Sequence, residues 1–158
     1  MSGLQAAAGR VFAERDWPIT EMEDGSGYAL DVEGSDTAWS ALVLTDDDEM
    51  VYVFYSLSPV DVPADKLERA SEFVDRANYG LVNAAFELDR ESGDVRLRTG
   101  MELATLPPQY VADDDFLEAV VLDLAAANIG IFDRYVTGLV AVSMGDVPVA
   151  HIVAEIEG

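Results

Sequence analysis

The stretch from Met50 to Ser56 constrains the fold more than any other part of the sequence. Successive side chains of a β-strand point to opposite faces of its sheet. Here both faces would be apolar, because one carries Tyr52 and Phe54 and the other carries Val51, Val53 and Tyr55. We therefore expect a central strand that is either covered on both sides or lies at an interface.

Other segments show strand patterns as well. Ile19 to Glu23, Tyr28 to Val32 and Trp39 to Thr45 precede the central strand, with Gly- and Asp-rich turns between them. A hairpin is expected after residue 83. Its inward positions are Ala84, Phe86, Leu88, Val95 and Leu97, and its outward positions are Glu87, Asp89, Arg96 and Arg98. The outward acids and arginines can pair across the two strands.

Helical spacing of apolar residues predicts the remaining elements. The expected helices cover residues 3–15, a segment that opens at Pro63 and runs to Leu81, a long segment that Asp113 begins, and Val149 to Glu157. Gly130 and Gly138 are expected to kink or end the long helix. The order α-β-β-β-β-α-β-β-α-α predicts an α+β fold, with an antiparallel sheet packed against helices.

Length and apolar content indicate one domain over residues 1–158. The most apolar run, Tyr135 to Met144, is about half the roughly 20 residues that a membrane-spanning helix needs. The first residues lack the basic-then-apolar order of a signal peptide. The chain has no cysteine, and a cytoplasmic location is expected.

The chain carries 31 acidic residues against 9 basic ones, a net charge of −22 spread evenly along its length. Such a field repels nucleic acid and anionic lipid, which we exclude as partners. The acidity either steers a basic partner or reflects a salt-rich cytoplasm, in which carboxylates stay hydrated and salt screens their repulsion. The even spread and the single lysine, Lys66, favour the second interpretation.

Catalytic and cofactor chemistry finds little support. His151, the only histidine, lies among apolar residues near the end of the chain, which is typical of a packing or surface position. The runs Asp46-Asp47-Asp48-Glu49 and Asp113-Asp114-Asp115 lack the alternating ligands and glycine of a calcium loop. No glycine motif for nucleotides is present. We expect no cofactor, no metal and no enzymatic activity.

Two motifs resemble the YbjN-like family, described as sensory transduction regulators with a fold similar to type III secretion chaperones. The first runs from Arg76-Ala77-Asn78-Tyr79-Gly80-Leu81 through Phe86-Glu87-Leu88-Asp89 to Gly93-Asp94-Val95-Arg96, and the second is Asp133-Arg134-Tyr135. The resemblance covers residues 39–157. It implies a binding or regulatory role, no catalytic residues, and a homodimer that presents its sheet and helices to a client chain.

The motif residues also have structural interpretations. We expect Asn78 to cap or turn the chain and Tyr79 to anchor the turn by packing. Asp133 and Arg134 are expected to form a pair that orients the long helix, and an architectural role is also expected for Phe86, Asp89 and Tyr135.

These observations favour a non-enzymatic protein-binding module with a chaperone-like or regulatory role, acting as a homodimer. Aromatic side chains are frequent anchors at protein interfaces, so Trp39, Tyr52 and Phe54 are candidate contact residues, with burial in the core as the alternative. A small-molecule sensor with a pocket between the sheet and the long helix is a second hypothesis. A metal-dependent enzyme that uses the aspartate runs is a third.

Overall fold

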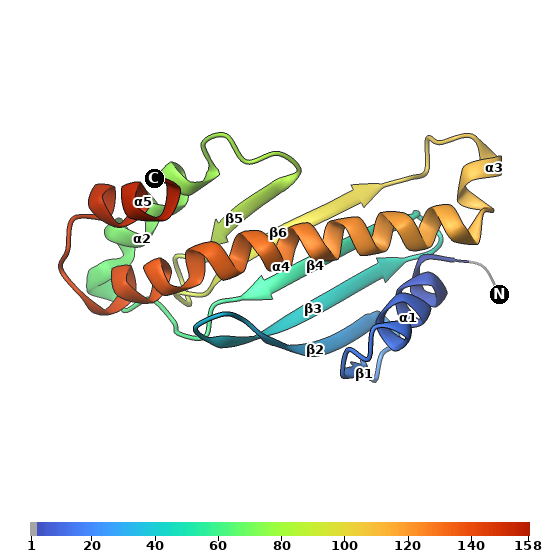
Figure 1. Cartoon of the computed structure of the whole chain (residues 1–158), viewed down its shortest axis with the longest axis horizontal. Coiled ribbons are helices and arrows are strands. Elements are labelled where there is room, and N and C mark those ends of the chain that lie inside the picture. The colour runs from blue at the N-terminus through green and yellow to red at the C-terminus, as the bar shows by residue number, and fades with distance from the viewer. Residues whose placement is uncertain (1–2) are drawn as a thin grey trace.

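The computed structural model describes residues 3–158 (Figure 1). Its elements are α1 (Leu4–Glu14), β1 (Ile19–Glu21), β2 (Gly27–Glu33), β3 (Ala38–Asp46), β4 (Val51–Leu57), a 3₁₀ turn (Ala64–Lys66), α2 (Leu67–Asn78), β5 (Ala84–Leu88), β6 (Val95–Glu102), α3 (Pro108–Val111), α4 (Asp114–Met144) and α5 (Val149–Glu157). This order confirms the predicted α+β fold, to which the structure adds the 3₁₀ turn and the short α3.

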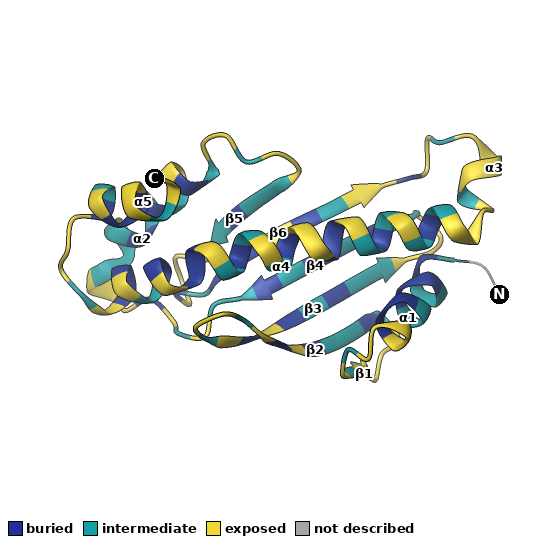
Figure 2. Ribbon diagram, viewed as in Figure 1, coloured by how far each residue is buried: buried dark blue, intermediate teal, exposed yellow. Residues whose placement is uncertain are grey.

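The six strands form one antiparallel sheet in the order β1-β2-β3-β4-β6-β5. β4 is central, as its sequence predicts. Cross-strand register places Leu30, Ala41, Ser56, Leu97 and Phe86 in one row on the inner face, and all five are buried. The strands alternate between buried and half-buried residues along their length (Figure 2).

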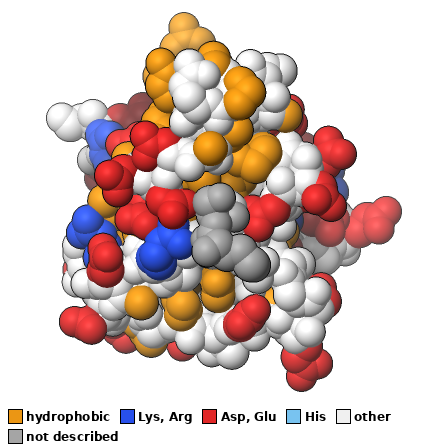
Figure 3. All heavy atoms as spheres, turned by 90° about the vertical axis from the view of Figure 1, so that its right-hand side faces the viewer, with side chains coloured by type: hydrophobic (Ala, Val, Ile, Leu, Met, Phe, Trp, Pro, Cys, Tyr) orange, Lys and Arg blue, Asp and Glu red, His pale blue; other side chains and the backbone are white. Residues whose placement is uncertain are grey.

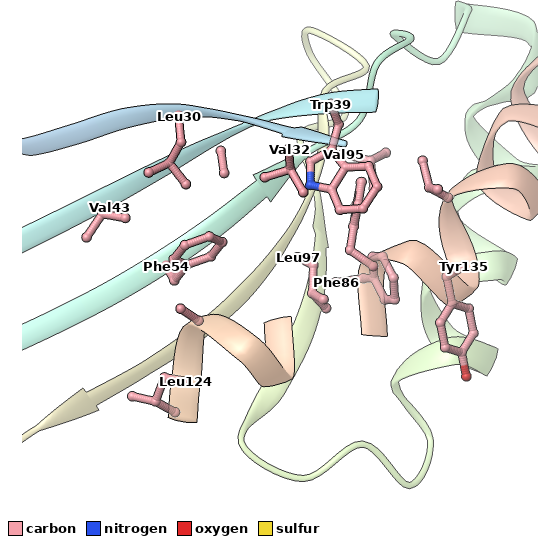
Figure 4. Packing of buried hydrophobic residues seen from close by; sticks show 14 of the residues in the cluster. Leu30, Val32, Trp39, Val43, Phe54, Phe86, Val95, Leu97, Leu124 and Tyr135 are labelled. Atoms are coloured by element: carbon pink, nitrogen blue, oxygen red, sulfur yellow. The ribbon is translucent and has the colours of Figure 1, made fainter. Parts of the chain in front are cut away.

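The helices pack against the inner face of the sheet. α4 runs across it and contacts β4 and β6, while α1 packs beside α4, and α2 packs against β5, α4 and α5 (Figure 1). Inner-face side chains such as Phe54 and Leu97 point toward the side of the sheet that carries Leu124 and Tyr135 of α4 (Figure 4). The buried apolar side chains of these elements form one core cluster.

Three polar contacts fix the position of α4 over the sheet. The buried Asn128 Nδ2 donates to the main-chain oxygens of Phe54 (2.9 Å) and Leu97 (3.0 Å). Tyr52 donates from its hydroxyl to the Val121 oxygen at 3.3 Å, and its burial raises the pKa of that hydroxyl. Each contact satisfies a polar group that would be costly to bury alone.

The long helix begins where Asp113 caps it, with the side chain accepting from Phe116 N at 3.2 Å. The prediction that Gly130 and Gly138 would end this helix is wrong, because α4 continues through both to Met144. Gly138 instead lets α5 approach closely. A Cβ atom at this position would lie 2.4 Å from Ile156 Cδ1. No helix within residues 3–158 is both long and apolar enough to cross a bilayer.

Candidate protein-binding surface

The three aromatic residues that sequence reasoning named as contacts lie in the core. Tyr52 and Phe54 are fully buried beneath α4, and Trp39 is 4% exposed. The Trp39 ring packs at a tilt against Phe132 and donates from Nε1 to Ser56 Oγ at 2.9 Å. A partner protein cannot reach these side chains in this structure, so they do not fit the role of contact residues and take the alternative role in the core.

The opposite side of the same strands forms a second surface, here called the open sheet face. At its centre lie Leu42 and Leu44 of β3 and Val53 and Tyr55 of β4, which face one another in register. All four are half-buried, and none belongs to the core cluster. Among the residues that the structure describes, no helix covers this side. β4 is therefore apolar on both faces but covered on one, which favours the interface alternative.

Small residues continue the open sheet face sideways. Ala29 lies beside Leu42, and Gly100 lies beside Val53. A hollow of ≈ 610 Å³ opens at one end of the face, with Leu57, Pro59 and Asp31 among its lining residues. The uncharged centre of this face stands out on a chain with a net charge of −22. Figure 3 shows the more usual pattern, with acidic side chains spread over the end of the molecule near α3.

Arginines border this face on the β6 side. Arg98 and Arg96 both bond to Glu87 of β5, at 2.6 and 2.7 Å, which confirms the predicted cross-strand pairing. Arg96 also stacks over the ring of Tyr55, 4.2 Å from its centroid. Partial burial raises the pKa of Glu87, but the hydrogen bonds from Arg98 and Arg96 outweigh it, so the net pKa is below its usual value. These contacts fix the positions of both arginine side chains on this flank.

A cavity of ≈ 310 Å³ lies at the edge of the sheet, and residues of β2 and Ile129 of α4 are among its lining residues. Trp17, Leu30, Val32 and Ile129 supply most of its apolar wall. Its volume is at the lower end of the range for small-molecule sites.

Asn78 completes the free edge of the sheet. Its Oδ1 accepts from Phe86 N at 2.7 Å, and its Nδ2 donates to Phe86 O at 3.0 Å. The side chain therefore takes the place of a neighbouring strand beside β5, where backbone groups would otherwise have no strand partner. Phe86 itself points inward and packs against Phe73 and Tyr135. Asn78 thus bonds to the main chain eight residues away rather than capping its own helix.

Tyr79 does not pack as predicted. Its side chain is 91% exposed, and Val82 in the same loop is 81% exposed. The reason is that the chain turns outward after α2 through Gly80, at φ 90°, and Asn83, at φ 56°. The ring consequently points away from the core.

Asp89 is part of the β5–β6 turn. Its Oδ1 accepts from Glu91 N at 2.9 Å and from Ser92 N at 3.4 Å. These bonds, led by the one from the Glu91 main chain, lower the pKa of the carboxyl group. Such a turn explains the motif position without a bound cation.

The second motif ties α4 to distant segments, and no direct ion pair joins Asp133 to Arg134 among the described contacts. Asp133 accepts from Ser35 N at 2.7 Å and from Ser35 Oγ at 2.6 Å, which fixes the β2–β3 loop. Arg134 donates to the Ile156 oxygen of α5 at 3.2 Å. Tyr135 donates to Glu157 at 2.6 Å, and burial together with Glu157 raises its pKa to about 12.

The aspartate runs have structural partners. Asp46 accepts from the main chain of Asp48 and Glu49 within the β3–β4 turn. Asp47 caps α1 from that turn, with Oδ1 2.6 Å from Leu4 N. Among residues 3–158, no three acidic or histidine side chains converge as metal ligands would. His151 is exposed on α5.

The fold and the open sheet face thus define a small α+β domain whose sheet is covered on one side. The chain belongs to the YbjN family. The model of this family, which carries the description "Putative bacterial sensory transduction regulator", matches residues 10–122. The match includes the Asn78 motif and all six strands but ends inside α4, before Asp133. No curated protein matches the chain.

Proposed function

We propose that this chain is a non-enzymatic protein-binding module with a regulatory or chaperone-like role, and that it binds its partner through the open sheet face. One observation carries the proposal: Leu42, Leu44, Val53 and Tyr55 form an uncovered apolar centre on an otherwise acidic molecule. Contiguous exposed apolar patches on a folded domain commonly mark interaction sites. The family description, a sensory transduction regulator, is compatible with this role.

The test is affinity capture from the native lysate at its native salt level, with matched variants. Leu44→Lys places a charge at the centre of the face without entering the core, because Leu44 lies outside the core cluster. Ala126→Lys is the control, since this residue is exposed on α4, on the other side of the molecule. The proposal requires that Leu44→Lys loses a partner that the wild type and Ala126→Lys retain. Equal capture by all three would refute it.

A small-molecule sensor is the second candidate, and the cavity of ≈ 310 Å³ beside Trp17 is the observation that favours it. Native mass spectrometry of the purified chain would detect a retained ligand. Ile129→Lys would fill this cavity with a charged side chain. A ligand that remains bound to the Ile129→Lys variant would contradict this assignment.

A further inference from the structure

The charges around the open sheet face are arranged asymmetrically. In the rows that contain Tyr55 and Leu57 of β4, β6 contributes Arg98 and Arg96 to this side, whereas β2 contributes Asp31. Three acidic residues lie on the same side at the ends of the strands: Glu33, Asp46 and Glu102. Between the β6 and β2 residues lie only the uncharged residues of β3 and β4 in the two middle rows. In the row through Leu57, the face therefore has a positive residue on β6, uncharged residues in the middle and a negative residue on β2.

The strand register places the opposite charges at the same position along the strand direction. Leu57 pairs with Arg96, and Asp31 pairs with Ser40. Because Ala41 lies opposite Ser56, the next residues along, Ser40 and Leu57, are neighbours too. Arg96 and Asp31 thus lie at the two ends of one row of residues that crosses the sheet from β6 to β2.

We infer that the partner of the open sheet face is a second copy of this chain, packed face to face about a two-fold axis that runs parallel to the strands between β3 and β4. Such an axis places β6 of each copy over β2 of the other, so Arg96 faces Asp31 of the second copy twice. The inference rests on the proposed function of this face and specifies its occupant. An isologous interface requires a self-complementary surface of this type.

The same axis superposes the apolar centres. Tyr55 then faces Leu42 of the second copy, and Val53 faces Leu44. Sheets that pack face to face in this way keep their strands within about 30° of each other, so these pairings are preserved approximately. Two copies with a net charge of −22 repel each other, and this orientation brings the uncharged centres of the two faces together.

The size of the face predicts a weak, reversible dimer. Four strands spaced about 4.8 Å apart span about 19 Å, and seven residues of β4 span about 23 Å. The footprint is roughly 440 Å² per copy, below the ~800 Å² per partner of a stable interface. Sedimentation equilibrium should therefore cover about 10 µM to about 1 mM protein at an ionic strength of about 0.15 M.

Charge reversal tests the orientation. Arg96→Asp and Asp31→Arg should each weaken self-association at least about tenfold, because each creates two like-charge contacts. An equimolar mixture of the two variants should associate as the wild type does, since both contacts in the mixed dimer are again between opposite charges. The double variant should also dimerise. Asp123→Arg, on the exposed side of α4, is the control and should leave the dimer unchanged.

Cross-linking gives an independent measurement, because the chain has no native cysteine. Asp31→Cys mixed with Arg96→Cys should be joined by a short bismaleimide cross-linker, because sheets packed face to face lie about 10 Å apart. Neither variant should be joined as efficiently alone, because like positions are displaced by a further three strand spacings, about 14 Å, across the sheet. Both Arg96 variants lose the contacts with Glu87 and Tyr55, so circular dichroism must show that they fold. Asp31→Arg keeps these contacts and tests the orientation without them.

The second-copy inference would be overturned by a wild type that stays monomeric over the whole concentration range. It would also be overturned if the mixture of Arg96→Asp and Asp31→Arg associates no better than either variant alone. The proposed function fails separately, when Leu44→Lys retains every captured partner. A monomeric chain whose captured partner is lost on Leu44→Lys would refute the dimer and leave the binding role of the face intact.

Discussion

Replacing Asn78 by alanine is the sharpest test of how this sheet is held together. The side chain exchanges two hydrogen bonds with the main chain of Phe86, at 2.7 and 3.0 Å, and both are partly buried. Alanine keeps the helical backbone of α2 but removes both bonds. The N–H and C=O groups of Phe86 then face the free edge of β5 without a protein partner.

The magnitude follows from the two bonds. A typical internal hydrogen bond contributes about 1 kcal/mol net, and a partly buried group left unpaired costs somewhat more. We therefore expect Asn78→Ala to lower the free energy of unfolding by about 2–3 kcal/mol. For a chain of 158 residues this corresponds to a decrease in Tm of roughly 4–12 °C.

Urea unfolding followed by circular dichroism measures this loss, with the m-value as a check that the unfolded state is unchanged. Hydrogen exchange of the Phe86 amide should accelerate in the same variant, because its acceptor is gone. Tyr79→Ala is the matched control, since the adjacent ring is 91% exposed and should contribute less than about 0.5 kcal/mol. A loss below about 0.5 kcal/mol for Asn78→Ala, or an equal loss for Tyr79→Ala, would refute the edge-cap role.

Three further predictions concern capping, pH and salt. Asp47→Ala should lower stability by about 1 kcal/mol in thermal unfolding, because the cap of α1 is lost, whereas an unchanged Tm would show that Leu4 N needs no side-chain acceptor. The folded-state pKa of Tyr135 is raised to about 12 from an ordinary value near 10, so the stability it contributes is fully present below pH 10 and is lost as the pH rises toward 12. Urea unfolding across this range should show a larger loss in the wild type than in Tyr135→Phe, since the raised pKa of Tyr52 affects both proteins, and parallel curves would contradict the role of Tyr135. Raising the salt from about 0.1 M to about 1 M should increase Tm, because the screening length falls from about 10 Å to about 3 Å across an acidic surface; a Tm that is independent of salt would count against the environmental interpretation of the charge.

Local pattern determined much of this protein. The alternation in β4, β5 and β6 gave each side chain its face, because a strand has a fixed period of two, and this is why the Glu87 pairs with Arg96 and Arg98 could be predicted. The central place of β4 also followed from its own residues. The motif around Asn78 was sufficient to indicate the YbjN family.

Only the tertiary structure decided which face of β4 the helices cover. Both faces are apolar, so the sequence offered two equivalent surfaces, and the placement of α4 through Asn128, Tyr52 and the core buried one of them. The cap that Asp47 provides for α1 and the tie between Asp133 and Ser35 link residues far apart in sequence, and local spacing carries no information on such distances. The sequence by itself thus determined the elements and their faces. The open sheet face exists because long-range packing used one apolar side of the sheet and left the other uncovered.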